Sequence, residues 1–548
     1  GERIAGEHLL ASDRSRHPRA GGLPALRGWA EPRNTWGTLT LPELILAHDL
    51  GTTGNKASLF GPEGDPVASA YAPYPTAYSR PGWAEQDPGD WWGAVVRSTQ
   101  ELLGGSRYGP DDVAVVAFSG QMMACLPVDA EGAPLRSAII WADQRAEAQA
   151  DVLAERVGRR RVYEITGHRA GASYTAAKAM WLRDEQPEVY RRTHRLLQPK
   201  DYVAYRLTGE IATDFSDASG TNLFDLRART WSGDILQAID LDPALLPPAQ
   251  PSATVIGSVT ASAAAETGLR PGTPVVIGGG DGACATAGAG VVGPGDAYAY
   301  LGASSWIANI SREPLYDPAQ RTFTFAHLDP AYLFPTGTMQ CAGGSFDWLE
   351  RLYRGGGEGA LYDEMEEQAA GAAAGAGGLL FLPYLIGERS PHWNPHARGA
   401  FVGLTMTHGR AEMARAVLEG VAFNLRIILD AFREQGAPIA ALRLIGGGAR
   451  SDAWRQILAD ILNVPLLRTG LIVEATALGA AIAGGVGVGL YPGYEVAAEL
   501  APAYPGEEPD PAHAGRYEEQ YGVFREAYEA LVPIYERMAA PRQTGGTQ

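Results

Sequence analysis

The sequence predicts an α/β protein with two large domains, and three observations support this. Its 548 residues exceed what one hydrophobic core usually organises. Short apolar runs typical of buried strands alternate with longer periodic segments typical of helices. Many of the 68 glycines stand in short turns between these segments, as tight strand-to-helix loops require.

Composition and charge exclude several classes of function. The net charge of -18 and the lack of a basic stripe argue against a nucleic-acid partner, because phosphate-reading surfaces need clustered Lys and Arg. No run approaches the roughly 20 apolar residues of a membrane-spanning helix, so no membrane partner is expected. Cys125, Cys284 and Cys341 are far apart and fit neither a disulfide framework nor a zinc site. We therefore expect a cytoplasmic protein.

Residues 1–42 differ from the rest of the chain. They mix acidic and basic residues with Gly and Pro, and they lack both an apolar core and a periodic pattern. We interpret them as a disordered extension or an over-called start. A transit peptide is disfavoured by the acidic residues.

The first half of the chain opens with three apolar runs that predict a β-meander: Leu44–Asp49, Asn55–Phe60 and Val67–Tyr74. Helices are then predicted at Trp91–Leu103, Thr175–Glu185 and Asp201–Leu207, and strands at Val113–Phe118 and Ser137–Trp141. A Pro-rich stretch at 247–251 indicates a linker. We therefore predict a first domain over 43–255 and a second domain over 256–540.

The second half restarts the alternation. Strands are predicted at Val275–Ile277, Asp296–Leu301, Trp306–Ile310 and Leu442–Ile445, and helices at Ala283–Ala289, Met413–Phe432, Asp452–Leu462 and Tyr517–Met538. The segments 50–54 and 301–305 are similar short turns, each between two strands. Two such units opening two α/β halves indicate an internal duplication.

The turn after the first strand has the residues of a phosphate site. Asp49 ends the strand, and Gly51, Thr52 and Thr53 follow in a tight turn. Backbone N–H groups and hydroxyls in such a turn can surround phosphate oxygens, and the carboxylate can hold Mg²⁺ beside them. The alternative is a plain hairpin in which glycine supplies an unusual φ angle.

Two further glycine-rich turns follow buried strands. In the first, Asp281 is flanked by glycines, so it is open to a ligand and could accept a proton from an attacking hydroxyl. The alternative is an Asp that caps the following helix. In the second, 446–451, the backbone can approach a flat ring or a phosphate at a helix N-terminus. Its alternative is a simple strand-to-helix turn.

Two motifs of other nucleotide-binding folds are excluded. The chain contains no Gly-x-x-x-x-Gly-Lys-Ser/Thr segment, so a P-loop kinase is ruled out. The segment 288–293 matches the dinucleotide fingerprint formally, but it falls at a predicted helix end instead of a strand-to-helix turn.

Taken in order, these segments resemble the FGGY family of carbohydrate kinases over nearly the whole chain from Leu44 to Met538. The stretch 173–185 looks like the first family signature, with Ala179 where a larger apolar residue is usual. The stretches 399–404 and 412–419 look like the second signature without exception. The resemblance implies two actin-like (ribonuclease-H-like) ATPase domains with a cleft between them, and an ATP- and Mg²⁺-dependent kinase that phosphorylates a small sugar.

The same resemblance assigns site residues. Asp281 is implied as the general base, and Asp49 is implied to position the metal with the nucleotide. The residues implied to bind the nucleotide are Asp49, Gly51, Thr52, Thr53, Gly302, Ala303, Ser304, Gly343, Asp347, Gly447, Gly448 and Asp452. Ala303 departs from the usual Thr, which puts one nucleotide contact in doubt. The segment 474–480 looks like an inter-domain helix.

The sugar pocket departs more from the family. Gln121, Met122 and Met123 occupy the expected substrate loop, where glycerol kinases have Arg-Glu and xylulokinases have Gln-Met-His. Gly282 stands where xylulokinases have Asn. Asp143 and Arg145 are expected near the sugar or supporting its loop, with a surface ion pair as the alternative. The resemblance favours a ketopentose such as xylulose, phosphorylated at its 5-position.

Alternatives remain open at this point. Another ketose, a polyol or gluconate is the second choice of substrate. A non-catalytic sugar-binding actin-like protein is a remote third, disfavoured because Asp49 and Asp281 are both present. The expectation of a homodimer rests only on the frequency of C2 dimers among soluble enzymes.

Overall fold

The computed structural model describes residues 43–354, 361–470 and 474–539. The prediction of a disordered extension at 1–42 lies outside the described residues.

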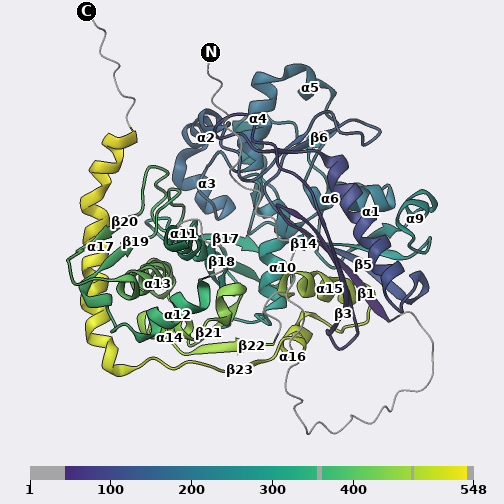
Figure 1. The fold of residues 1–548 in the computed structure, drawn as a ribbon. Helices are drawn as coiled ribbons and strands as arrows, with labels where there is room; N and C mark the ends of the chain where they lie inside the picture. Colours follow the sequence, from purple (N-terminus) through teal and green to yellow (C-terminus); the bar gives the residue numbers. More distant parts are fainter. Residues whose placement is uncertain (1–42, 355–360, 471–473, 540–548) are drawn as a thin grey trace, which may run out of the picture. The chain divides into compact units, whose positions relative to one another are not determined.

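The first sheet has the strand order β13-β14-β5-β1-β2-β3 (Figure 1). Its strands are β1 (Leu44–Leu50), β2 (Gly54–Phe60), β3 (Pro66–Pro73), β5 (Val113–Gly120), β13 (Val255–Ser258) and β14 (Pro274–Gly280). The first three form the antiparallel meander that the sequence predicts. Strand β5 lies parallel to β1 and to β14, so the carboxyl ends of these three strands meet at one edge.

The second sheet repeats this arrangement. Its order is β17-β18-β16-β15-β21-β22-β23. The strands are β15 (Ala297–Leu301), β16 (Ser305–Asn309), β17 (Phe323–Ala326), β18 (Leu333–Met339), β21 (Leu442–Ile445), β22 (Leu466–Thr469) and β23 (Ala503–Pro505). Strands β15, β16 and β18 run antiparallel, whereas β15, β21 and β22 run parallel. The order and direction of β15, β16, β18, β21 and β22 match those of β1, β2, β3, β5 and β14 in the first sheet, as the two similar turns predict.

The two sheets do not divide where the Pro-rich stretch suggested. Residues Ala249–Gln250 form a short strand, β12, that pairs with β9 (Thr213–Asp214). The chain then continues into β13 and β14 of the first sheet. A proline cluster marks a break in local structure, but it does not show which sheet the next strand joins. We therefore propose a domain boundary between Gly288 and Ala297 in place of 255/256.

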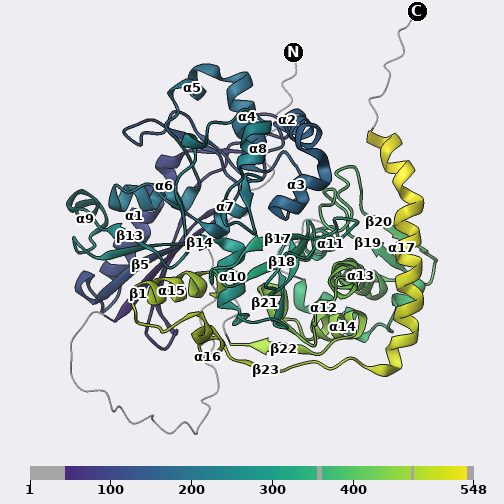
Figure 2. The same ribbon diagram turned by 180° about the vertical axis from the view of Figure 1, so that it is seen from behind.

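Two helices, α10 (Asp281–Gly288) and α15 (Ala475–Gly487), lie between the two sheets in both views (Figures 1 and 2). They pack closely because glycine stands at each contact: a Cβ at Gly479 would lie 1.9 Å from the carbonyl oxygen of Cys284. The hydrophobic core around them includes Ile45 from the first sheet and Ile445 from the second. This core joins the two halves of the chain at their cleft edge.

Other helices pack on each sheet. Helices α1 (Pro88–Gly105) and α6 (Pro199–Thr208) contact strands of the first sheet, and α9 (Ala261–Thr267) packs against these two helices. Helix α13 (Arg410–Glu434) contacts strands of the second sheet, and the helices that pack against α13 are α11 (Gly343–Arg354), α12 (Tyr362–Gly371), α14 (Asp452–Leu462) and α17 (Pro511–Ala539). The predicted helices are all present, although most begin or end a few residues away from the predicted bounds.

A smaller helical region is inserted in the first half. It contains α2 (Glu147–Leu153), α3 (Arg159–Thr166), α4 (Thr175–Glu185), α5 (Pro187–Arg192), α7 (Phe215–Ser219) and α8 (Gly233–Ala238). The strand predicted at Ser137–Trp141 is reduced to the two residues of β7, Ala138–Ile139. Helix α4 has the predicted bounds, and it carries the first family signature.

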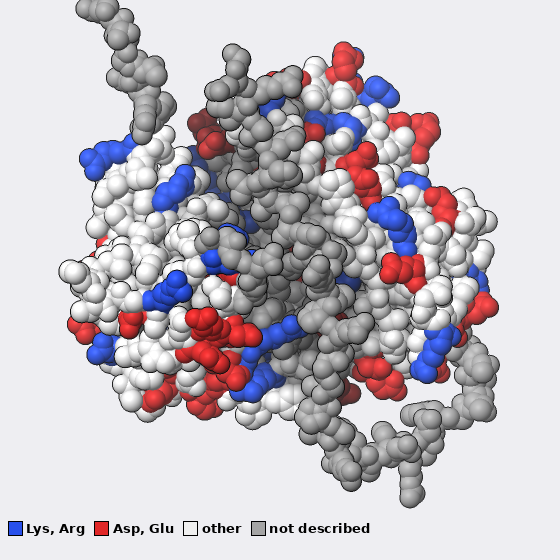
Figure 3. Space-filling model, viewed as in Figure 1, with Lys and Arg blue, Asp and Glu red and all other residues white. Residues whose placement is uncertain are grey.

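Charges on the described surface are mixed. Figure 3 shows Lys and Arg side chains interspersed with Asp and Glu over the visible face. Across the described ranges, no helix combines the length and apolar character needed to cross a membrane.

Candidate active site

The turn after β1 is held from behind by a set of hydrogen bonds. The amide of Gly51 donates to the carbonyl of Gly54 at 3.0 Å, which closes the turn. The backbone carbonyl of Thr52 accepts a hydrogen bond from Gln86 Nε2 at 2.7 Å, and the Thr52 hydroxyl accepts one from Trp141 Nε1 at 2.9 Å. Because its shape is fixed in this way, the turn can present its amides to an anion without further ordering.

Asp49 lies at the carboxyl end of β1, beside the end of β5. Ser119 Oγ donates to Asp49 Oδ1 at 2.9 Å, across the register that pairs these two residues. Burial raises the pKa of Asp49, while Ser119 and the charge of Lys56 oppose the rise. Asp49 is therefore a desolvated carboxyl group in the cleft.

Asp281 begins α10, directly after β14. Burial is the main cause that raises its pKa to about 7, and the charge of Asp49 adds to the rise. The Gly282 amide donates to its Oδ1 at 2.8 Å and opposes the shift. The alternative of a helix N-cap is not what the structure shows, since Gly280 occupies the cap position and Asp281 is already helical.

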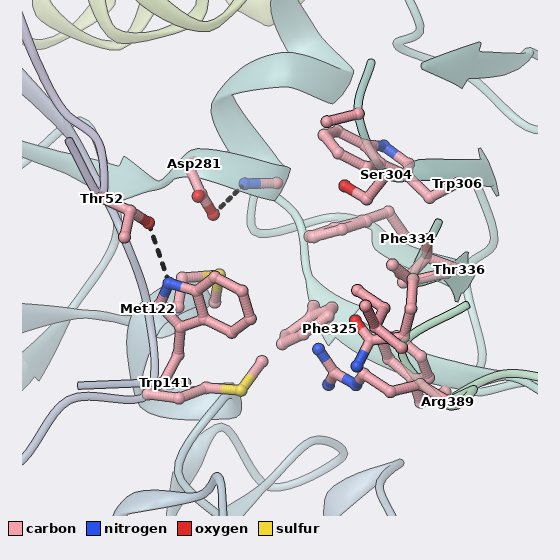
Figure 4. A pocket seen from close by; sticks show the side chains of 17 residues that line it. Thr52, Met122, Trp141, Asp281, Ser304, Trp306, Phe325, Phe334, Thr336 and Arg389 are labelled. Carbon is pink, nitrogen blue, oxygen red and sulfur yellow. Dashed lines mark hydrogen bonds between the residues drawn. The ribbon is translucent and has the colours of Figure 1, made fainter. Parts of the chain in front are cut away.

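A cavity of about 410 Å³ opens in front of Asp281 (Figure 4). It is lined by residues from both halves of the chain: Thr52, Met122, Met123, Trp141, Asp281, Gly282, Ala303, Ser304, Trp306, Phe323, Phe325, Phe334, Thr336, Thr338, Gln340, Ile386 and Arg389. Both predicted phosphate turns, near Thr52 and near Ser304, therefore reach the same cavity as the predicted base. Residues about 250 positions apart meet here because the two sheets face each other across α10 and α15.

The walls of this first cavity are largely aromatic, which sequence reasoning missed. Phe325 and Phe334 stack at 5.1 Å between ring centroids, and Trp306 stacks on Tyr300 at 4.0 Å. A signal was present in the alternation of Phe323 with Phe325, which places both rings on one face of β17. The cavity thus combines an aromatic wall with the polar side chains of Thr52, Ser304 and Arg389, a mixture typical of small-molecule sites.

The predicted substrate residues separate into two groups. Met122 and Met123 line the cavity, as does Gly282. Gln121 lies behind the first phosphate turn, where its Nε2 donates to the carbonyl of Gly51 at 3.3 Å and to Gln86 Oε1 at 2.7 Å. Gln121 thus supports the turn from the buried side.

Asp143 and Arg145 form a buried ion pair at 2.6 Å, which Glu85 joins through Arg145 Nη1 at 2.6 Å. The guanidinium of Arg145 also lies over the ring of Trp83 at 3.6 Å. Neither residue is among those that line the cavity, whereas Trp141 from the same loop is. Burial of the pair rules out the surface ion pair, and support of the substrate loop stays a prediction.

Besides the aromatic wall, sequence reasoning did not single out Lys178, which lies in α4. Its buried Nζ donates to the carbonyls of Met123 (2.7 Å), Ile140 (2.8 Å) and Ser173 (2.6 Å). Burial is the main cause that lowers the pKa of Lys178 to about 7. It ties together three loops, of which the Met123 loop lines the cavity in a left-handed conformation at φ 62°.

The predicted nucleotide residues of the second half gather at the carboxyl ends of β15 and β21. The amide of Gly343, at the start of α11, donates to the carbonyl of Gly302 at 2.9 Å. Gly446 packs against Leu301, and a Cβ at Gly448 would lie 3.0 Å from the Leu301 side chain. At Gly447 a Cβ would meet nothing within 4 Å, so the turn leaves an open, flat backbone surface there.

The two predicted acidic nucleotide residues have different surroundings. Asp347 lies half-buried in α11. Asp452 is 88% exposed and pairs with Arg455 at the start of α14. The structure places both on the side of the second sheet that carries Gly302 and Gly447.

The described residues contain no group of three or more His, Cys, Asp or Glu side chains suited to a metal ion. The carboxylates available in the cleft are Asp49 and Asp281, whose charges act on each other. Such a pair fits a hydrated divalent cation bound jointly with phosphates, because Mg²⁺ keeps several waters and uses one or two carboxylates.

Comparison with known proteins identifies the family of this chain. Residues 44–288 match the model of the FGGY family of carbohydrate kinases, N-terminal domain, and residues 297–488 match the C-terminal domain. The xylulose kinase of Escherichia coli K12 is 37% identical over 495 residues, which cover 90% of this chain and all of that protein.

Two solved structures share the fold over 90% of this chain. They are a gluconate kinase from Lactobacillus acidophilus (TM-score 0.85, 28% identity, 99% of that chain) and a xylulose kinase from Rhodospirillum rubrum (TM-score 0.83, 31% identity, 100% of that chain). They confirm the predicted fold class of two actin-like domains. The chain belongs to the FGGY family of carbohydrate kinases.

Proposed function

We propose that this protein transfers the γ-phosphoryl group of ATP to a hydroxyl of a small sugar, a ketopentose such as xylulose, to form the 5-phosphate. One observation carries the proposal above all: Asp281, with a pKa of about 7, faces the cavity that both phosphate turns also line. Within the described part of the chain Asp281 has no ion-pair partner, so its proton affinity is available for chemistry.

The proton step follows from this geometry. The Asp281 carboxylate accepts the proton of the sugar hydroxyl as the hydroxyl oxygen bonds to the γ-phosphorus and the bond to ADP breaks. A base with a pKa near the working pH combines a large ionised fraction with a strong drive to take the proton. Positioning supplies the rest, because phosphoryl transfer needs little covalent help from the protein.

The phosphate turns stabilise the charge that develops on the phosphoryl oxygens. Thr52 of the first turn and Ala303 and Ser304 of the second turn line the cavity, so we expect their hydroxyls and backbone amides to meet the phosphate oxygens. Ala303 contributes only its backbone where the family usually has a hydroxyl. The open backbone at Gly447 supports placement of the nucleotide along the second sheet.

The cleft also fits Mg²⁺, for which Asp49 is the proposed holder. When bound, the ion offsets phosphate charge. Asp49 is suited to this role because Ser119 fixes its orientation and because its raised pKa reflects a desolvated charge that a cation would compensate.

The choice of acceptor rests on relatives as well as on the cavity. Xylulose kinases from Escherichia coli and Bacillus subtilis support a ketopentose. A gluconokinase from Bacillus licheniformis, 30% identical, supports gluconate, another ketose or a polyol as the second candidate. A non-catalytic sugar-binding role is the least supported, because Asp49 and Asp281 act on each other in one cleft.

We also propose a cytoplasmic location and a homodimer. The three cysteines lie buried as free thiols, which a reducing compartment preserves. The homodimer rests on the general frequency of C2 symmetry.

The test is an ADP-release assay with Mg-ATP and a panel of D-xylulose, L-xylulose, D-ribulose, L-ribulose, glycerol, erythritol and gluconate. Strong turnover of one pentulose would support the proposal and identify the acceptor. ADP release that never exceeds the sugar-free background would refute it.

A further inference from the structure

A second cavity, of about 520 Å³, adjoins the first. The two share four lining residues, Trp141, Gln340, Ile386 and Arg389, so a ligand can extend from one into the other. The second cavity lies on the side away from Asp281, which lines only the first. Its remaining walls come from Ala142 and Gln144, from the segment 169–174 and from residues between 388 and 395.

Two arginines face this second cavity. Arg169 and Arg389 both line it, and each guanidinium lies near the ring of Trp393, at 5.2 Å and 5.9 Å from the ring centroid. Within the described residues neither arginine has an ion-pair partner, unlike the buried Arg145 and Arg415. Both are half-buried, so their charge is partly removed from water.

One acidic group lies among the residues around these arginines, so it can balance the charge of at most one of them. Glu388 is the one carboxyl group among the residues that line the second cavity. Burial raises the pKa of Glu388 to about 8, and the amides of Gln340 (2.8 Å) and Arg389 (2.9 Å) donate to its Oε1. Even when Glu388 is ionised, two arginines face one carboxylate, so the lining of the second cavity carries a net positive charge.

The positive charge is not explained by the nucleotide phosphates. The turns after Asp49 and at 302–304 do not line the second cavity. In Figure 4, Asp281 and Arg389 lie at opposite ends of the first cavity. An acceptor whose hydroxyl reaches Asp281 would therefore direct its other end toward Arg389 and the second cavity.

We propose that the second cavity is an oxyanion-binding subsite, in which Arg169 and Arg389 hold a carboxylate or phosphate group. A guanidinium presents a planar fork that matches such groups, and Trp393 keeps both forks in place by stacking. Two sources supply the oxyanion: the far end of an acceptor, as in an open-chain sugar acid, or a separate small anion. The acceptor source rests on the second candidate of the proposed function, a sugar acid such as gluconate, whereas the subsite itself does not rest on the proposed function.

Isothermal titration calorimetry without nucleotide, at constant ionic strength, tests the subsite. The probes are D-xylonate, its neutral analogue xylitol, and inorganic phosphate. We expect D-xylonate to bind about ten- to a hundredfold more tightly than xylitol, the value of one charged hydrogen-bonded pair. The difference should disappear in Arg169→Gln and be reduced in Arg169→Lys, which keeps the charge but loses the fork.

Arg160→Gln is the matched control, because it removes one positive charge from an exposed site on α3. The control should keep the full difference between D-xylonate and xylitol. Phosphate binding that depends on Arg169 and adds to xylitol binding would identify a separate anion as the source. Equal affinities for D-xylonate and xylitol without phosphate binding, or a preference that survives Arg169→Gln, would overturn the subsite.

These outcomes are separable from the proposed function. Binding is measured without ATP, so a failed ADP-release panel would refute the kinase proposal and leave the titration result standing. Conversely, if the protein phosphorylates a ketopentose but its anion binding does not depend on Arg169, only the proposal of the subsite is refuted.

Discussion

Replacing Asp281 with asparagine separates two properties of this residue: the stability cost of burying its carboxylate and its chemical role as a base. The pKa of Asp281 rises from 3.8 to about 7, mainly through burial. Asparagine keeps the size of the side chain and removes the ionisation. We expect Asp281→Asn to stabilise the free protein at neutral pH while it stops phosphoryl transfer.

The magnitude follows from proton linkage. The folded state holds the Asp281 proton more tightly than the unfolded state, so the stability from this group is complete below about pH 4 and is lost as the pH rises to about 7. A shift of about three units corresponds to at most about 4 kcal/mol at 1.36 kcal/mol per unit. With about 2.1 cal/mol/K of unfolding entropy per residue, that is a rise in melting temperature of about 1–4 °C.

The assay compares melting temperatures of wild type and Asp281→Asn between pH 4.5 and 8.5. The difference in melting temperature between the variant and the wild type should increase with pH up to about pH 7 and stay constant above it. Asp111→Asn, at a carboxylate that is 87% exposed, is the control and should show no such trend. A constant difference across the pH range would refute the desolvated state of Asp281.

The same variant tests the chemistry. Loss of the base should lower kcat by about 100- to 10,000-fold, the usual contribution of general base catalysis. Binding of ATP should not weaken, because the base acts on the acceptor. Weakened ATP binding with transfer preserved would contradict the assigned role.

Three further substitutions probe the cavity. Lys178→Met leaves the carbonyls of Met123, Ile140 and Ser173 without their donor. We expect the free energy of unfolding to fall by a few kcal/mol, and the KM for sugar, but not for ATP, to rise. An unchanged KM for sugar would argue against the positioning role. Met123→His restores the residue usual in xylulokinases and should raise activity on xylulose, whereas an unchanged or lower rate would favour another acceptor. Gly447→Ala adds a Cβ that meets no atom within 4 Å, so it should leave the melting temperature unchanged and weaken ATP binding; retained ATP affinity would remove Gly447 from the nucleotide site.

Local sequence determined much of this protein. The meander at 44–73, helix α4 at 175–185 and strand β21 at 442–445 follow from apolar periodicity and from glycine-rich turns, which act over a few residues. The two turns at 50–54 and 301–305 predicted the duplication, which the matching order and direction of strands in the two sheets reproduce. Strand ends and glycines made Asp49 and Asp281 candidate site residues, and the resemblance to the FGGY family gave them their expected roles.

Tertiary structure decided the rest. Whether β14 joins the first or the second sheet depends on pairing with β5, more than 150 residues earlier, and no local pattern records that choice. The same holds for Gln121, which lies behind the phosphate turn, although Met122 next to it faces the cavity. The pKa of Asp281 and the unpaired charge of Arg169 arise only when distant segments exclude water from both side chains, since desolvation depends on what packs around a group and not on its neighbours in the chain.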